Sequence, residues 1–181
     1  MKSLTTLTLG VFICSAMIST PASAQKKGTP KLSDAEIASV AVVANQNDIN
    51  FAVIAKKKSK DPEVLKFADM MANDHKSIID QAVALVTKLK VTPKDNAVSK
   101  QLSANAAKTS KMLNSKSGKD FNKAYIDNEV AYHKAVIAEV ETVLIPQAQN
   151  AELKALLQKV VPILKNHLEQ AEKSQKIISS K

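Results

Sequence analysis

Four long stretches of the chain repeat apolar residues at alternating steps of four and three, with few residues that would break a helix. The 181-residue sequence holds only 3 Gly and 6 Pro, and aromatic residues make up 3% of it. Steps of four and three place side chains on one face of an α-helix. A β-sandwich or barrel would instead need turn residues and large β-forming side chains. The sequence therefore predicts an all-α fold.

Local signals predict where these helices begin and end. Ser33 and Glu36 form a capping box, and Asp61-Pro62-Glu63 supplies a cap, a proline for the first helical position and an acid for the first turn. We expect long helices over about 34–58, 62–90, 119–144 and 150–177, and a shorter, more polar helix over 96–114. Pro162 should kink the last helix. Helices of matched length joined by short turns pack antiparallel. The prediction is an antiparallel four-helix bundle over residues 33–178, with one extra short helix between the second and third long helices.

The N-terminus has the pattern of a cleavable signal peptide. A positive charge at Lys2 precedes a largely apolar run over 4–18, and Ala22-Ser23-Ala24 follows as a cleavage site. We predict a signal peptide over 1–24, a disordered lead-in over 25–32, and a periplasmic or secreted protein. No later segment holds eighteen consecutive apolar residues, so no transmembrane span is predicted in the mature chain. The one cysteine, Cys14, lies in the leader, which excludes a thiolate site from the mature chain.

The positive charge has a structural interpretation. The formal net charge is +9, and all 26 basic residues are Lys. Many stand at the expected C-terminal ends of helices, where cations complement the helix dipole. Nucleic-acid binding proteins favour Arg forks and stacking aromatic residues, which this chain lacks. We therefore predict no nucleic-acid partner, and leave open a salt-sensitive contact with envelope components or anionic surfaces.

Each of the four apolar stripes is interrupted once by a polar residue. The interruptions are Asp48, His75, His133 and His167, and the three histidines are the only ones in the chain. Each lies near the middle of its expected helix, so an antiparallel arrangement would bring all four to one level. Glu129 stands one turn before His133 on the same face. In the first stripe, either Ala41 and Ala44 or the neighbouring Val40 and Val43 could face inward.

Burying a carboxylate and three imidazoles without partners would cost several kcal/mol. The groups could bond to one another, or they could hold a metal ion. Neutral imidazole and carboxylate suit transition metals such as Zn, Fe or Cu. We take His75, His133, His167, Asp48 and Glu129 as candidate metal ligands, and predict no catalytic residue and no other cofactor site.

Neighbouring polar and aromatic residues receive structural interpretations. Asp74 is expected to orient an imidazole or to face solvent. Tyr125 and Tyr132 are expected at the boundary of the core.

Three segments resemble one family of exported bacterial proteins. They are NDINFAVIAKKKSKDPEVLKFADMMANDHKSI, SGKDFNKAYIDNEVAYHKAVI and LKALLQKVVPILKNHLEQAE. Their most specific pieces are the Asp74-His75 pair, Phe121-x-x-x-Tyr125 leading to His133, and the motif that ends just after His167. The segments are similar to the domain-of-unknown-function family DUF4142, whose members are often labelled outer-membrane proteins.

The resemblance implies a ferritin-like fold, without a settled activity. The family often has Glu in the first helix, where this chain has Asp48. The paired Glu-x-x-His of di-iron ferritins is absent, because positions 72, 130 and 164 are Ala, Val and Leu. The resemblance therefore does not extend to ferroxidase chemistry.

Two hypotheses about function follow. The first is an exported ferritin-like bundle that binds one transition metal through three core histidines and a carboxylate, with a role in envelope stress protection. The alternative is a non-enzymatic structural or interaction protein of the envelope, in which the His/Asp layer only fixes helix packing.

Overall fold

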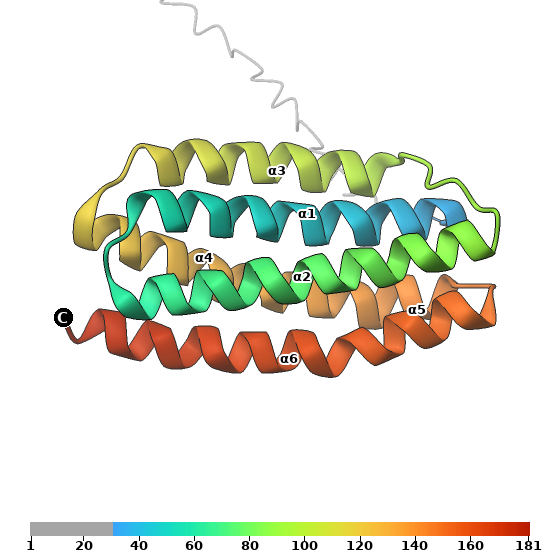
Figure 1. Cartoon of the computed structure of the whole chain (residues 1–181). Helices are drawn as coiled ribbons and strands as arrows, with labels where there is room; N and C mark the ends of the chain where they lie inside the picture. The colour runs from blue at the N-terminus through green and yellow to red at the C-terminus, as the bar shows by residue number, and fades with distance from the viewer. Residues whose placement is uncertain (1–30) are drawn as a thin grey trace, which may run out of the picture.

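A computed structural model describes residues 31–181, and every regular element in this part of the chain is helical (Figure 1). The all-α prediction is therefore confirmed for these residues. The predicted signal peptide over 1–24 and residues 25–30 of the predicted lead-in lie outside them. The elements are α1 (Asp34–Lys58), α2 (Pro62–Lys88), α3 (Ala97–Asn114), α4 (Gly118–Glu139), the π-helix η1 (Val140–Leu144), α5 (Ile145–Gln147) and α6 (Ala151–Ser179).

The helices begin where the capping signals place them. Glu36 Oε2 accepts from Ser33 N at 3.0 Å and from Ser33 Oγ at 2.7 Å, which completes the capping box of α1. Asp61 Oδ1 accepts from the backbone N–H of Glu63 at 2.9 Å at the start of α2. Satisfying these free N–H groups fixes the first turn of each helix.

The third long helix departs from the expectation near its end. It was expected to run as one α-helix over 119–144, but the last five of those residues form the π-helix η1. The wide turn stands just before Pro146, which has no N–H to donate. The wider turn leaves Val140 and Leu144 both buried, so the apolar stripe continues through it.

The long helices lie side by side (Figure 1). α1 packs against α2, α4 packs against α6, and α2 also packs against α6. α3 packs mainly against α1, on the outer side of this group. Only Ser99, Ala106 and Leu113 of α3 are buried, which agrees with its sparse apolar pattern.

The core consists of two apolar clusters at opposite ends of the helices. One contains Phe51, Met71 and Phe121, and the other contains Ile37, Leu144 and Leu157. The positions of the polar interruptions along the helices fall between these two clusters. A polar layer therefore crosses an otherwise apolar interior.

The buried face of α1 combines residues from both predicted alternatives. Val40 is 1% exposed and Ala44 is buried, whereas Ala41 and Val43 are only half-buried. Among the described residues, α1 is the one helix long and apolar enough by composition to cross a membrane, and 56% of that stretch is buried inside the protein. A helix with its apolar face turned inward passes the same test as a membrane span.

Candidate metal centre

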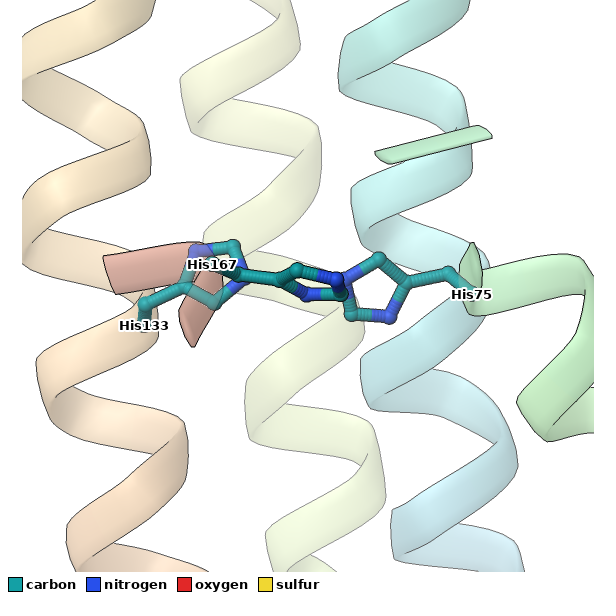
Figure 2. Close-up of side chains that lie close together, drawn as sticks. All are labelled: His75, His133 and His167. Carbon is teal, nitrogen blue, oxygen red and sulfur yellow. The ribbon is translucent and has the colours of Figure 1, made fainter. Parts of the chain in front are cut away.

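The three histidines reach a common point from three helices. His75 comes from α2, His133 from α4 and His167 from α6, and their rings point toward one another (Figure 2). The ring centroid of His75 lies 5.6 Å from that of His133 and 5.0 Å from that of His167. The centroids of His133 and His167 are 5.4 Å apart. One ring nitrogen from each histidine lies within 4.8 Å of the others.

The two candidate carboxylates are as deeply buried as the histidines. Asp48 and Glu129 are both 0% exposed, and no histidine of the group exceeds 3%. Asp48 enters from α1, the one long helix that provides no histidine. Glu129 lies one turn before His133 on α4.

Hydrogen bonding fixes which nitrogen of His75 carries the proton. The ring nitrogen Nδ1 lies 2.7 Å from Asn45 Oδ1. The amide nitrogen of Asn45 donates to the carbonyl oxygen of Ala41 at 2.8 Å, so the amide must present its oxygen to the ring. His75 Nδ1 therefore donates, and Nε2 keeps its lone pair.

The same reasoning assigns the other two rings. His133 Nδ1 donates to the backbone carbonyl of Glu129 at 3.0 Å, which leaves the lone pair on Nε2. His167 Nε2 donates to Asp74 Oδ2 at 3.0 Å, which leaves the lone pair on Nδ1. Each ring thus has one nitrogen held by a neighbouring acceptor.

The three remaining nitrogens are buried and have no hydrogen-bond partner. They are His75 Nε2, His133 Nε2 and His167 Nδ1. Buried polar atoms are almost always paired, so three unpaired lone pairs at one point call for an explanation. In metal sites, the non-ligating ring nitrogen is held in this way by a carboxylate, a carbonyl or another acceptor, which orients the lone pair toward the ion.

Asp48 lies at the distance expected of a fourth ligand. Its Oδ2 is 3.3 Å from His75 Nε2 and 3.6 Å from His133 Nε2. Two ligands about 2.1 Å from one tetrahedral ion stand about 3.4 Å apart. Neither Asp48 oxygen has a hydrogen-bond partner. Asp48 thus lies at ligand distance from two of the three histidines, and imidazole with carboxylate is a donor combination that transition metals accept.

Glu129 belongs to a second, overlapping group. It joins Asp48 and His133 in a set whose ligand atoms lie within 4.8 Å of one another, separate from the set of three histidines. Its Oε2 is 3.7 Å from His133 Nδ1, the nitrogen that donates to the backbone. Both carboxylate oxygens of Glu129 are buried without a partner. The structure thus brings the five predicted ligands together as two sets that share His133.

Burial shifts the pKa values of this centre toward uncharged forms. Desolvation raises the pKa of Asp48 to about 8, and it raises the pKa of Glu129 well above its usual range, with the Asp48 charge adding to the effect. Desolvation lowers the pKa of His133 to about 4 and lowers those of His75 and His167. Imidazoles that stay neutral at pH 7 keep their lone pairs available for a metal.

Asp74 and the two tyrosines of α4 lie close to the three histidines and the two carboxylates. Asp74 does orient an imidazole, although it is that of His167 on α6 and not that of its neighbour His75. Tyr132 is half-buried, and its hydroxyl donates to the carbonyl of Ala44 at 2.8 Å. The boundary interpretation of Tyr125 is wrong, because that residue is 0% exposed and its hydroxyl has no partner. Burial raises the pKa of Tyr125 well above its usual value.

Sequence reasoning missed Asn45, which holds His75. The signal available was a polar residue one turn before Asp48 in an apolar stretch of α1. That spacing places Asn45 and Asp48 on the same face of the helix.

Comparison with known proteins identifies the family. The profile of DUF4142, a domain of unknown function, matches residues 19–173 and so spans all five candidate ligands. No curated protein and no solved structure gives a significant match. On the extent of the profile match, the chain belongs to the DUF4142 family.

Proposed function

We propose that this protein binds one transition metal ion through His75, His133, His167 and Asp48. The observation that carries the proposal is the arrangement of the ring protons. In each of the three histidines, one ring nitrogen is hydrogen-bonded to an acceptor, and the other is buried without a partner. An ion at the centre would satisfy three lone pairs and one carboxylate oxygen at once.

Glu129 is proposed as a second carboxylate beside this centre. It lies within reach of Asp48 and His133 and, like Asp48, outside the three-histidine set, but only Asp48 lies close to both His75 Nε2 and His133 Nε2. In this position it would hold a proton or balance the charge of the ion, because a divalent ion with Asp48 alone leaves a positive charge in an apolar surrounding. Zn, Fe and Cu all accept imidazole and carboxylate ligands.

The proposed setting is a ferritin-like four-helix bundle exported to the cell envelope. The pairwise packing of α1, α2, α4 and α6, with inward-facing ligands at mid-length, supports the bundle. The sequence pattern over 1–24 supports export. A role in envelope stress protection and a contact with envelope components or anionic surfaces stay predictions from the sequence.

Elemental analysis tests the proposal directly. The purified protein is stripped with a chelator, dialysed against Zn²⁺, Fe²⁺ or Cu²⁺ in turn, and analysed for bound metal. We expect one ion per chain for at least one metal, and a loss to baseline in His133→Ala. Lys134→Ala is the matched control, because Lys134 is the exposed neighbour of His133 on α4. A wild-type protein that takes up none of the three metals would overturn the proposal.

A second candidate function is a purely structural polar layer. It is favoured by two hydrogen bonds that join different helices, His75 to Asn45 between α2 and α1, and His167 to Asp74 between α6 and α2. On this alternative, His133→Leu should keep or increase the stability, since an apolar residue of similar size replaces a poorly satisfied polar one. The melting temperature should then be the same with and without metal.

A further inference from the structure

A cavity beside the proposed metal site has not been assigned any role so far. Its volume is about 330 Å³, and α1, α2, α3, α4 and α6 all contribute to its lining. Pockets that hold small molecules have volumes of roughly 300–1,000 Å³ and mostly apolar walls. The volume alone therefore places this cavity within the range of ligand sites.

Most of the cavity wall is apolar. Small residues face it from two helices, including Ala41 on α1 and Ala82 on α2, and larger ones such as Leu157 and Val160 face it from α6. Cavities with such walls stay dry and take up apolar molecules. Because a cavity of about 150 Å³ holds a benzene-sized ligand, this one suits a body of about ten to twelve non-hydrogen atoms.

Polar residues also line the cavity, and one group of them belongs to the proposed metal site. Asp48, His75 and His133 line the cavity together. Both oxygens of Asp48 and the Nε2 atoms of the two histidines are buried without hydrogen-bond partners. Each of these atoms exposes less than 1 Å², so a ligand oxygen would pair with them after a small movement of the side chains that line this part of the cavity.

The cavity also reaches the surface. Among its lining residues, Gln101 and Asn105 of α3 and Ala135 of α4 are exposed. Because α3 packs mainly against α1, the face of α4 beside it is left less covered. A ligand would enter between α3 and α4 without unfolding of the core.

We infer that this cavity binds an apolar molecule of about ten carbons that carries one oxygen-bearing end group, with the oxygen placed against Asp48, His75 and His133. A hydroxyl can donate to an imidazole lone pair, and a hydroxyl or carboxyl oxygen can coordinate an ion held there. The position of the oxygen rests on the proposed metal site. The apolar part of the cavity does not, because its walls contain no proposed ligand.

Binding of matched probes to the metal-free protein tests the cavity separately from the metal. The probes are 4-butylphenol, butylbenzene and 4-butylbenzoate, which share one apolar body and differ in the oxygen end. Calorimetric titration should show 4-butylphenol binding to the wild type with one site per chain. It should bind at least tenfold more tightly than butylbenzene, and this preference should disappear in His133→Leu.

A filled-cavity variant locates the site. Ala82→Phe should weaken 4-butylphenol binding at least tenfold, whereas Val83→Phe, at a 50% exposed neighbouring position, should leave it unchanged. Ala41→Leu serves as a milder second variant if Ala82→Phe does not fold. Circular dichroism confirms the helical content of each variant. No probe binding to the wild type, or equal binding by the position 82 and position 83 variants, overturns the inference.

The metal-loaded protein distinguishes the two possible end groups. In protein loaded with Co²⁺, coordination of a ligand oxygen changes the visible absorption spectrum. We expect 4-butylbenzoate to change the spectrum more strongly than 4-butylphenol, because its carboxylate carries the charge that a cation favours. A protein that binds no metal but still binds 4-butylphenol in the cavity would refute the proposed function and support the cavity as a ligand site.

Discussion

The Oδ2 atom of Asp48 lies 3.3 Å from Nε2 of His75, and neither atom has another hydrogen-bond partner. His75 Nε2 holds a lone pair because its other nitrogen donates to Asn45. A carboxylate oxygen and an imidazole lone pair repel each other unless a proton or a cation lies between them. The pair therefore links metal binding to the protonation of Asp48.

Metal affinity should rise with pH. The pKa of Asp48 is raised to about 8 in the metal-free protein, so near neutral pH this carboxyl carries a proton that must leave when the ion binds. We expect tighter binding at pH 8 than at pH 6.5 and release of a proton on binding. Calorimetric titration in two buffers of different ionisation enthalpy measures the proton directly. The same number of protons released by wild type and Asp48→Asn would contradict this assignment.

The metal-free protein should lose stability between pH 6.5 and 8. In this range Asp48 is ionised in the unfolded chain but protonated in the folded one, so the folded state binds more protons. The free energy of unfolding then falls as pH rises, by up to about 1.4 kcal/mol per pH unit. The raised pKa of Glu129 acts in the same direction.

Urea unfolding in the presence of a chelator tests this slope. Asp48→Asn cannot ionise and should show a smaller fall between the two pH values. Below pH 6.5 the lowered pKa values of the histidines act the other way, because the unfolded chain then binds more protons. Stability should therefore also fall as the pH is lowered toward 4. A stability that increases from pH 6.5 to 8 would show that Asp48 is ionised in the folded protein.

Removing the Asn45 side chain should weaken metal binding without removing a ligand. Asn45 holds Nδ1 of His75 at 2.7 Å and so keeps the lone pair on Nε2. Loss of such a supporting partner lowers metal affinity by about 10–100-fold. Competition with a chromogenic chelator gives the affinity of Asn45→Ala. The control is Gln46→Ala, on the exposed side of the same helix; equal affinities in the two variants would exclude an orienting role for Asn45.

The two tyrosines should respond in opposite ways to loss of the hydroxyl. The Tyr125 hydroxyl is buried without a partner, so Tyr125→Phe should keep stability unchanged or increase it by about 1 kcal/mol. The Tyr132 hydroxyl donates to the carbonyl of Ala44, so Tyr132→Phe should lose about 1 kcal/mol. Urea unfolding of both variants, each without metal, checks the sign. A clear loss in Tyr125→Phe would reveal a partner for that hydroxyl.

Helix limits and inward faces could be predicted because both depend on local signals. Ser33 and Asp61 cap the residues that directly follow them, and the apolar period continues through His75, His133 and His167. The burial of all three histidines follows from that period alone.

Contacts between helices could not be predicted in the same way. Which histidine Asp74 meets depends on the rotation of α2 against α6, and the sequence has no local signal for that rotation. The π-helix η1 has the same apolar pattern as an α-helix, so the sequence pattern could not predict it. The depth of Tyr125 could have been inferred, because it stands four residues before Glu129 on the same face of α4.

The four proposed ligands come from four separate helices, and the last of them along the sequence, His167, lies on α6. No fragment that ends before α6 contains all four proposed ligands. The complete proposed site can therefore form only after α6 has packed against the other helices. If the proposed site holds an ion, that ion would therefore reach full coordination only where α6 folds against the other helices. The metal available in the compartment where this folding is completed would then set which ion the proposed site takes up.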